Sequence, residues 1–201
     1  MDIGFRSLRI GQRLAAGFAV PALLCLALVA FGVAGMHQLN GSLEQINSRL
    51  LPKVEQIGGL TLNVARIAVA MRDAALDKDA GEVAAEIKRI VALRAEIGQI
   101  IEALDKTIVR PEARARLAEV VALRKAFVPL QDRFLQLLQT GQREQAIALS
   151  HDEIDKAQGD YLRATEALLV TQKQLIGEEA RAGEDAYERM RWLAAALACA
   201  A

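Results

Sequence analysis

Arginine side chains on one predicted helix are the residues of this chain whose chemistry most suggests ligand binding. Arg66 and Arg72 flank an apolar stripe on that helix, which we predict to end near residue 76. A guanidinium group donates two parallel hydrogen bonds, a geometry that matches a carboxylate. The two arginines therefore predict a site for a small organic carboxylate. Most arginines on a helix surface are simply solvated, and that alternative stays open at this point.

Three further side chains are weaker candidates for the same site. Asn63 lies near the core edge of the same helix, one turn before Arg66. Arg133 follows Pro129 by four residues and could point inward, although a surface salt bridge is the simpler interpretation. Tyr161 is expected to be a core ring whose hydroxyl reaches water. The candidate ligand-binding residues are Arg66, Arg72, Asn63, Arg133 and Tyr161.

No residue pattern in the sequence predicts catalysis or cofactor binding. The chain contains no nucleophile elbow, P-loop, dinucleotide fingerprint or HExxH zinc motif. Its acidic residues mostly alternate with Lys and Arg at helix spacing, as they do on solvated faces. His151 is one of two histidines and has no partner at metal-ligand spacing, so we predict a solvated role for it. We expect no enzyme activity, no cofactor and no metal site.

A long apolar segment near the N-terminus determines how the rest of the chain is arranged. Residues 14–36 contain no charged side chain, and about 20 apolar residues are enough for a helix to cross a bilayer. Three arginines and one aspartate precede the segment, and such a positive flank favours the cytoplasmic side. We predict a cytoplasmic N-terminus over 1–13 and a first transmembrane helix over 14–36. The alternative is a cleaved signal peptide, although signal peptides usually have apolar regions of only about 7–15 residues.

The last residues of the chain look like the start of a second membrane segment. Trp192 follows Arg189 and Arg191, and the residues after it are apolar to the end of the sequence. An aromatic and basic edge before an apolar run is typical of a membrane interface. The run is too short to cross, since a helix rises only about 1.5 Å per residue. We predict that residues 192–201 begin a truncated second transmembrane helix; a frayed apolar C-terminus is the alternative.

The composition of the part between these segments favours a helical domain held by packing alone. The whole chain has 25 basic and 25 acidic residues, so it lacks the basic excess of a nucleic-acid-binding protein. Without the three arginines and one aspartate that precede residue 14, the rest of the chain has 22 basic and 24 acidic residues and is therefore slightly acidic. Cys25 and Cys199 both fall in the predicted membrane segments, so we expect no disulfide in the exported domain.

Apolar residues recur at three- and four-residue steps through the exported part, which predicts four helices. The first runs to about residue 76 with a kink near Pro52, and the second covers about 82–107. The third begins at Pro111, bends at Pro129 and ends before Gly141, and the fourth begins near Gln142. Short turns make successive helices antiparallel. We predict an all-α, up-down-up-down four-helix bundle over residues 37–191, continuous with transmembrane helices.

The same periodicity predicts the core. On the first three helices the expected core positions are Leu43, Ile46, Leu50, Ile57, Leu60, Val64, Ile67, Met71, Ala74, Val83, Ile87, Ile90, Leu93 or Arg94, Ile97, Ile101, Leu104, Leu117, Val120, Val121, Leu123, Phe127, Leu130, Phe134 and Leu138. Ser150 and Glu153 match a helix-capping box. We interpret that match as coincidental, because apolar residues continue on both sides of it.

A second apolar stripe on the first helix points to a partner chain. Leu62, Val69 and Leu76 lie about half a turn away from the core stripe. A helix that packs only inside one bundle does not need this second stripe, whereas a helix at a dimer interface does. In a two-fold dimer, Arg66 and Arg72 would meet their symmetry mates around a shared cleft. We therefore predict a homodimer through the first helix.

Four stretches carry a resemblance to a known family: IGQRLAAGFAVPALLCLALVAFGVAGMHQLN, RLLPKVEQI, TGQREQAIAL and YERMRWLAAALA. With them the chain resembles the N-terminal sensory region of a bacterial methyl-accepting chemotaxis protein that has a four-helix-bundle ligand-binding domain. The resemblance covers essentially the whole chain. It implies a periplasmic domain on the inner membrane that works as a homodimer and binds a small molecule or a periplasmic binding protein. A small sliding of the last helix would carry the signal across the membrane.

The resemblance also bears on the site and on the output. Aspartate-type receptors of the family use first-helix arginines at the dimer interface together with fourth-helix groups, and this chain lacks their closely spaced arginine set. Cytoplasmic signalling partners would be contacted only through a part beyond residue 201. The sequence thus predicts the sensing region of a transmembrane chemoreceptor. The alternatives are the same bundle on a histidine kinase or a cyclic-dinucleotide synthase, or a secreted helical binding protein.

Overall fold

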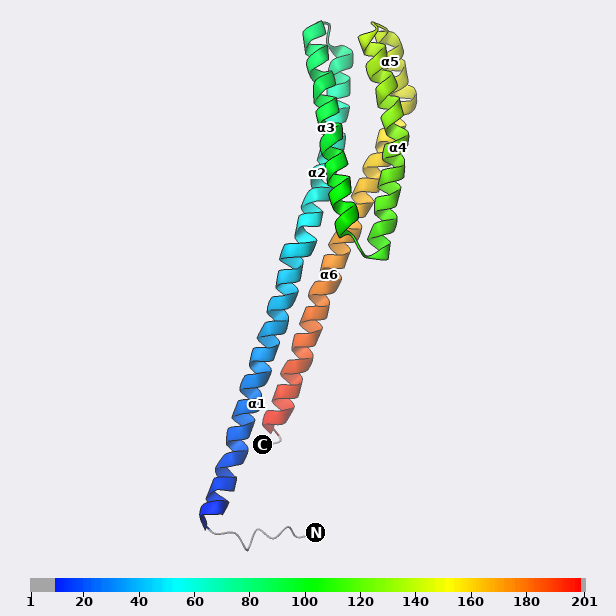
Figure 1. Ribbon diagram of the computed structural model, residues 1–201. Coiled ribbons are helices and arrows are strands. Elements are labelled where there is room, and N and C mark those ends of the chain that lie inside the picture. Colours follow the sequence, from blue (N-terminus) through cyan, green and yellow to red (C-terminus); the bar gives the residue numbers. More distant parts are fainter. Residues whose placement is uncertain (1–9, 200–201) are drawn as a thin grey trace. The chain divides into compact units, whose positions relative to one another are not determined.

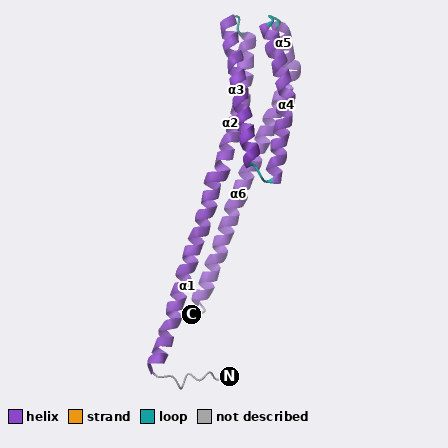
Figure 2. Ribbon diagram, in the orientation of Figure 1, coloured by secondary structure: helices purple, strands orange, loops and turns teal. Residues whose placement is uncertain are grey.

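The computed structural model describes residues 10–199, and its regular structure over that range is helical (Figures 1 and 2). The chain divides into two compact units, residues 1–48 with 177–201 and residues 49–176. In chain order the elements are α1 (Ile10–Gln45), the π-helical turn η2 (Ile46–Leu50), α2 (Leu51–Leu76), α3 (Ala80–Thr107), α4 (Pro111–Gln139), α5 (Arg143–Leu149), the π-helical turn η3 (Ser150–Ile154) and α6 (Asp155–Cys199).

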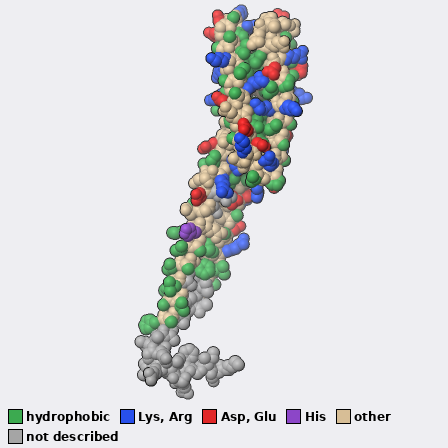
Figure 3. Space-filling model, viewed as in Figure 1, with side chains coloured by type: hydrophobic (Ala, Val, Ile, Leu, Met, Phe, Trp, Pro, Cys, Tyr) green, Lys and Arg blue, Asp and Glu red, His purple; other side chains and the backbone are tan. Residues whose placement is uncertain are grey.

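The first unit contains α1 and the C-terminal part of α6. The two helices approach closely at Gly35, where an added Cβ atom would lie 3.2 Å from Cε of Met190. Hydrophobic side chains are exposed along the described part of α1 (Figure 3), among them Phe18, Leu23, Leu26, Val29, Val33 and Met36. Over the residues that the structure describes, none of the helices combines the length and the hydropathy needed to cross a membrane. The membrane segments over 14–36 and 192–201 stay predictions, and residues 1–9 and 200–201 lie outside the described range.

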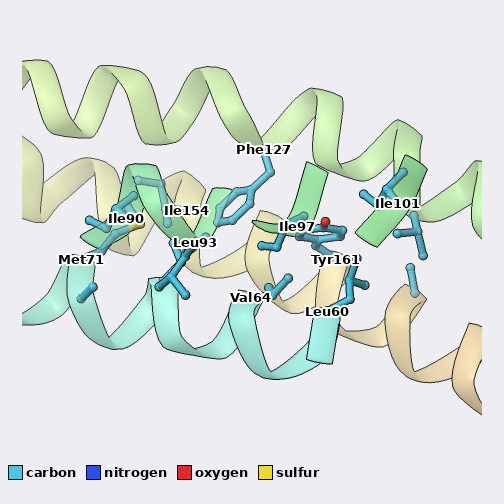
Figure 4. Packing of buried hydrophobic residues seen from close by; sticks show 14 of the residues in the cluster. Leu60, Val64, Met71, Ile90, Leu93, Ile97, Ile101, Phe127, Ile154 and Tyr161 are labelled. Carbon is cyan, nitrogen blue, oxygen red and sulfur yellow. The ribbon is translucent and has the colours of Figure 1, made fainter. Parts of the chain in front are cut away.

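The second unit is a four-helix bundle, as the periodicity predicts. α2 and α3 form one antiparallel hairpin and α4 and α5 form another, joined by short loops (Figures 1 and 2). The helices share one apolar core (Figure 4), in which the buried predicted positions are Ile57, Leu60, Val64, Ile67, Met71, Ala74, Ile90, Leu93, Ile97, Ile101, Leu104, Leu117, Val120, Phe127, Phe134 and Leu138.

Two predicted core positions are wrong. Val121 is exposed because Val120, one residue earlier, takes the core-facing position, and adjacent helical residues point about 100° apart. Leu43 is exposed on α1, in the unit that does not contain the bundle core. Apart from Val121, none of the predicted core positions from Ile57 onward is exposed, and the predicted stripe does not extend back into α1.

The helix ends follow local signals in the sequence. Asp79 is the N-cap of α3, and its Oδ1 accepts hydrogen bonds from the amides of Gly81 at 2.8 Å and Glu82 at 3.1 Å. α3 therefore begins two residues earlier than the sequence predicts. α4 spans the predicted range, and Pro129 lies inside it. After α4 the chain reverses at Gly141, whose φ of 75° suits glycine.

The helix is irregular near Pro52, where the sequence predicts a kink. The π-helical turn η2 ends two residues before this proline. Proline has no amide hydrogen, so the carbonyl one turn earlier loses its α-helical donor. The neighbouring Lys53 is partly buried, and burial first and the positive charge of Arg49 second lower the pKa of its ammonium group. The fourth helix is also interrupted by a π-helical turn, η3, although its periodicity predicts a continuous helix. Ser150 makes no side-chain cap there, so the capping-box match is coincidental as interpreted.

The largest buried side chains lie where α4 faces α6. The rings of Phe127 and Tyr161 have centroids 6.0 Å apart and planes inclined at 57° (Figure 4). The prediction of a solvated Tyr161 hydroxyl is wrong, because Oη is buried and has no hydrogen-bond partner among the described residues. Burial raises the pKa of this phenol to about 12, while the positive charge of Arg124 acts in the opposite direction.

Arginines hold the helix ends together. Nη1 of Arg114 donates to the carbonyls of Asp105 at 2.9 Å and Ile108 at 2.8 Å, and Nη2 donates to Oδ1 of Asp105 at 2.9 Å. These carbonyls belong to the last turn of α3 and its cap, where helical donors run out. At the other end of the bundle, Nη1 of Arg143 donates to the carbonyl of Ala75 at 2.7 Å and so joins the two hairpins.

We expect Arg114→Ala to lower the free energy of unfolding by about 1–2 kcal/mol, because charged hydrogen bonds to otherwise unpaired carbonyls are lost from a half-exposed position. Arg116→Ala is the matched control, since the partner of Arg116 among the described residues is the exposed Glu119 one turn away, and the cost of this change should stay below about 0.5 kcal/mol. Urea unfolding of both variants measures the difference. Equal costs would show that Arg114 does not fasten the end of α3.

We expect Tyr161→Phe to change stability little at pH 7, because the buried hydroxyl has no protein partner to lose. The contribution of the neutral phenol is fully present below the unfolded pKa of 10.0 and is lost as the pH rises toward about 12. Wild type should therefore lose about 2–3 kcal/mol more than the variant above pH 12. Urea unfolding at a series of pH values tests this, and parallel pH profiles would contradict it.

Candidate functional site

A groove of about 210 Å³ opens in the bundle unit between α2 and the continuous segment α5–η3–α6. Its apolar lining consists of Ala68, Met71, Ala75, Leu76, Ile147 and Ile154. Its polar lining consists of Arg72, Ser150, His151, Asp155 and Gln158. The groove thus combines an apolar wall with one guanidinium and several hydrogen-bonding groups, a combination typical of small-molecule sites.

Helix periodicity explains which α2 residues line the groove. Positions 68, 71, 72, 75 and 76 recur at three- and four-residue steps and share one face of α2. Met71 and Ala75 are buried, whereas Arg72 is exposed beside them, so its guanidinium lies at the edge of the apolar wall. Ala68 and Ala75 have the smallest side chains of this wall and leave space that larger residues would fill.

The opposite wall carries a polar cluster. Nδ1 of His151 lies 3.4 Å from Oδ2 of Asp155, one turn later in the chain. Ser150 is partly buried beside His151, and Gln158 extends the wall by a further turn. A hydroxyl, an amide and an imidazole can each hydrogen-bond a polar ligand. Chemically, the groove suits a small molecule that has one negative group for Arg72 and an apolar body.

The structure separates the two arginines that the sequence singles out. Arg72 lines the groove, whereas Arg66 is exposed and does not. Neither arginine forms an ion pair within the described part of the chain, so both guanidinium groups are free to bind an anion. In a single chain, therefore, Arg72 can contact a ligand in the groove and Arg66 cannot.

The other three candidates lie elsewhere. Asn63 is buried, and its Nδ2 donates to Oε2 of Glu96 at 3.0 Å, which joins α2 to α3. Nη1 of Arg133 lies 3.7 Å from Oε1 of Glu153, and both side chains are exposed, so Arg133 does not point inward. Tyr161 belongs to the core and borders a cavity of only about 10 Å³. Of the five candidates, only Arg72 reaches the groove.

The polar wall of the groove was not predicted from the sequence. Ser150, Asp155 and Gln158 are not among the predicted site residues, and the role predicted for His151 is a solvated one. Its imidazole is indeed exposed, yet it lines the groove. The signal that could have drawn attention to this wall is the five-residue step between the core residues Leu149 and Ile154. Among the described residues, no cluster of three or more His, Cys, Asp or Glu side chains could hold a metal ion.

Comparison with known proteins assigns the fold to a family. A family model described as a four helix bundle sensory module for signal transduction matches residues 7–187. No curated protein matches the chain. The match covers both α1 and the bundle, and it confirms the resemblance to the sensory regions of methyl-accepting chemotaxis proteins. The chain belongs to the family of four-helix-bundle sensory modules for signal transduction.

Proposed function

We propose that this chain is the sensing region of a transmembrane chemoreceptor whose bundle binds a small organic carboxylate in the periplasm. The observation that carries the proposal is the free guanidinium of Arg72 at the edge of an apolar groove. A carboxylate accepts two parallel hydrogen bonds from such a group. We propose no catalytic role and no cofactor for this region, because a sensor needs only to bind and to respond.

Features of the groove favour a ligand with an apolar body. Met71, Leu76 and Ile154 offer aliphatic surface, and burying that surface against a ligand contributes about 25 cal/mol per Å². Gln158 and Ser150 supply neutral hydrogen-bonding groups at the polar wall. Asp155 would repel a second carboxylate, so a monocarboxylate suits the groove better than a dicarboxylate.

The first unit supports the membrane part of the proposal. The row of exposed apolar side chains on α1 is expensive to keep in water and would be covered by lipid. Trp192 beside Arg191 on α6 is typical of a membrane interface. With the basic N-terminus in the cytoplasm, the bundle lies in the periplasm of a bacterial inner membrane. α6 is one helix from Asp155 at the groove to Cys199, so a shift at its start can pass along it.

The dimer part rests on the second stripe of α2. Leu62, Val69 and Leu76 remain 49%, 45% and 69% exposed in the single chain. Packing two such stripes around a two-fold axis would bury them and bring Arg66 near its symmetry mate. A shared cleft is thus a second candidate site, and it differs from the groove in requiring Arg66. The output could also be a histidine kinase or a cyclic-dinucleotide synthase, and the bundle could instead receive a periplasmic binding protein.

Thermal unfolding of the 201-residue chain against small carboxylates, amino acids, aromatic acids and sugars tests the proposal. A ligand at about 100 times its dissociation constant stabilises the folded state by roughly 2.7 kcal/mol, which raises the unfolding temperature by several degrees. We expect a monocarboxylate to give this shift and Arg72→Ala to abolish it. Arg66→Ala is the matched control and should respond like wild type.

The outcomes separate the candidate sites. Loss of the shift in both variants places the ligand in a shared dimer cleft. A full shift in both variants removes the arginines from the site and leaves the sensory assignment intact. If no small molecule shifts the wild-type curve, direct sensing of a carboxylate is wrong, and recognition of a periplasmic binding protein becomes the better proposal.

A further inference from the structure

The two sides of the groove carry polar groups of opposite kind. Arg72 lines the α2 side, and its guanidinium group can only donate hydrogen bonds. His151 and Asp155 line the other side, and the carboxylate of Asp155 can only accept them. Arg72 forms no ion pair with Asp155 within the described part of the chain, so the two charged groups remain available to a ligand. A ligand in the groove therefore meets donors on one side and an acceptor on the other.

The contact between His151 and Asp155 determines what the imidazole can offer. Nδ1 of His151 lies 3.4 Å from Oδ2 of Asp155. A carboxylate oxygen at this position favours the neutral tautomer that carries its hydrogen on the facing nitrogen, Nδ1. Nε2 of that tautomer has a lone pair and accepts a hydrogen bond. The neutral imidazole is thus a second acceptor on the same wall.

The other two polar side chains of this wall do not select between ligands. The hydroxyl of Ser150 and the amide of Gln158 can each donate and accept hydrogen bonds. His151 and Asp155 differ because a ligand group that has only lone pairs would leave both of them without a donor, which lowers affinity. The wall therefore favours a ligand group that carries a hydrogen, such as a hydroxyl or an amine.

The rest of the lining is apolar and bears on the body of the ligand. Met71 and Ala75 belong to α2, whereas Ile147 and Ile154 belong to the opposite segment. None of these side chains can bond a polar group, so a ligand that contacts both polar sides is apolar in its middle. The groove of about 210 Å³ has room for an aromatic ring, since a cavity of about 150 Å³ binds benzene.

We propose that the groove selects monocarboxylates that carry a hydrogen-bond donor, a hydroxyl or an amine, at the end opposite the carboxylate. This inference rests on the proposed function and deepens it by naming the class of ligand. Arg72 binds the carboxylate, and Nε2 of His151 accepts the hydrogen of the distal group. Asp155 is a positioning residue that holds the imidazole in its accepting tautomer. Arg72 therefore serves any carboxylate, whereas His151 determines which carboxylate binds best.

Four benzoates that differ in one substituent test the proposal with the 201-residue chain. 4-Hydroxybenzoate has its donor opposite the carboxylate, benzoate has none, 4-methoxybenzoate has an oxygen without a hydrogen, and 2-hydroxybenzoate has its donor beside the carboxylate. Isothermal titration calorimetry at about pH 7.5, where an ordinary imidazole is largely neutral, measures the four affinities. We expect 4-hydroxybenzoate to bind about tenfold more tightly than each of the others, which is the effect of one added hydrogen bond.

Variants of the two groove walls separate selectivity from carboxylate binding. His151 is exposed, so His151→Ala leaves the core intact, and it should bind benzoate like wild type and lose the preference for 4-hydroxybenzoate. Asp155→Asn should reduce this preference, because the ring loses the carboxylate that favours hydrogen on Nδ1. Arg72→Ala should weaken all four compounds by the same factor. His37→Ala, which removes the other histidine, is the matched control and should keep the full preference.

Each outcome decides the proposal. It is overturned if benzoate, 4-methoxybenzoate or 2-hydroxybenzoate binds wild type as tightly as 4-hydroxybenzoate does. It is also overturned if His151→Ala keeps the wild-type preference, because the distal donor then bonds another group, or if none of the four compounds binds. These failures differ from failure of the proposed function, in which no monocarboxylate of the wider series raises the unfolding temperature of the wild-type chain.

Discussion

The structure of the bundle depends on keeping each apolar stripe directed at one shared core along the full length of its helix. Burial of these side chains supplies the main stabilisation, since residues 49–176 contain no cysteine and the described residues contain no cluster that could hold a metal ion. The stripes of α2, α3 and α4 meet this requirement with ordinary helical steps. The last helix cannot, because the step from Leu149 to Ile154 is one residue too long. A π turn is the local structure that reconciles hydrogen bonding with this core.

Most of the fold could be predicted from the sequence because the signals are local and redundant. Periodicity, Pro111 and Gly141 place the hairpins within two residues of their observed ends. The π turn η3 is harder to predict, because neither proline nor glycine marks it and its sign is the spacing of the core residues on either side of it. A helix cap is recognised from the residues at one helix end. A change in the spacing of core residues is recognised only when the apolar stripes before and after it are compared.

The candidate site could be predicted only in part. Whether an arginine is paired with a carboxylate depends on which other helices pack beside it, and the local sequence does not show this. Arg133 is paired with Glu153, and Asn63 is paired with Glu96; both partners come from another helix. Arg94 is likewise paired with Asp132 of the neighbouring helix at 2.6 Å. Arg72 differs because it lines a groove and has no such carboxylate partner among the residues that the structure describes. An unpaired guanidinium is recognised only when none of its neighbours is a carboxylate, and the neighbours are known only once the packing of the helices is known.

The same reasoning explains why a ligand site fits at this place in a sensory bundle. A well-packed core resists change, because displaced side chains lose contacts without gaining others. At the π turn the helix already carries a residue that the core does not use, and the facing α2 wall contains the small residues Ala68 and Ala75. A ligand there can contact two hairpins without displacing core side chains. α6 begins at the end of this turn, so a ligand bound there would contact the start of a helix that continues unbroken to Cys199.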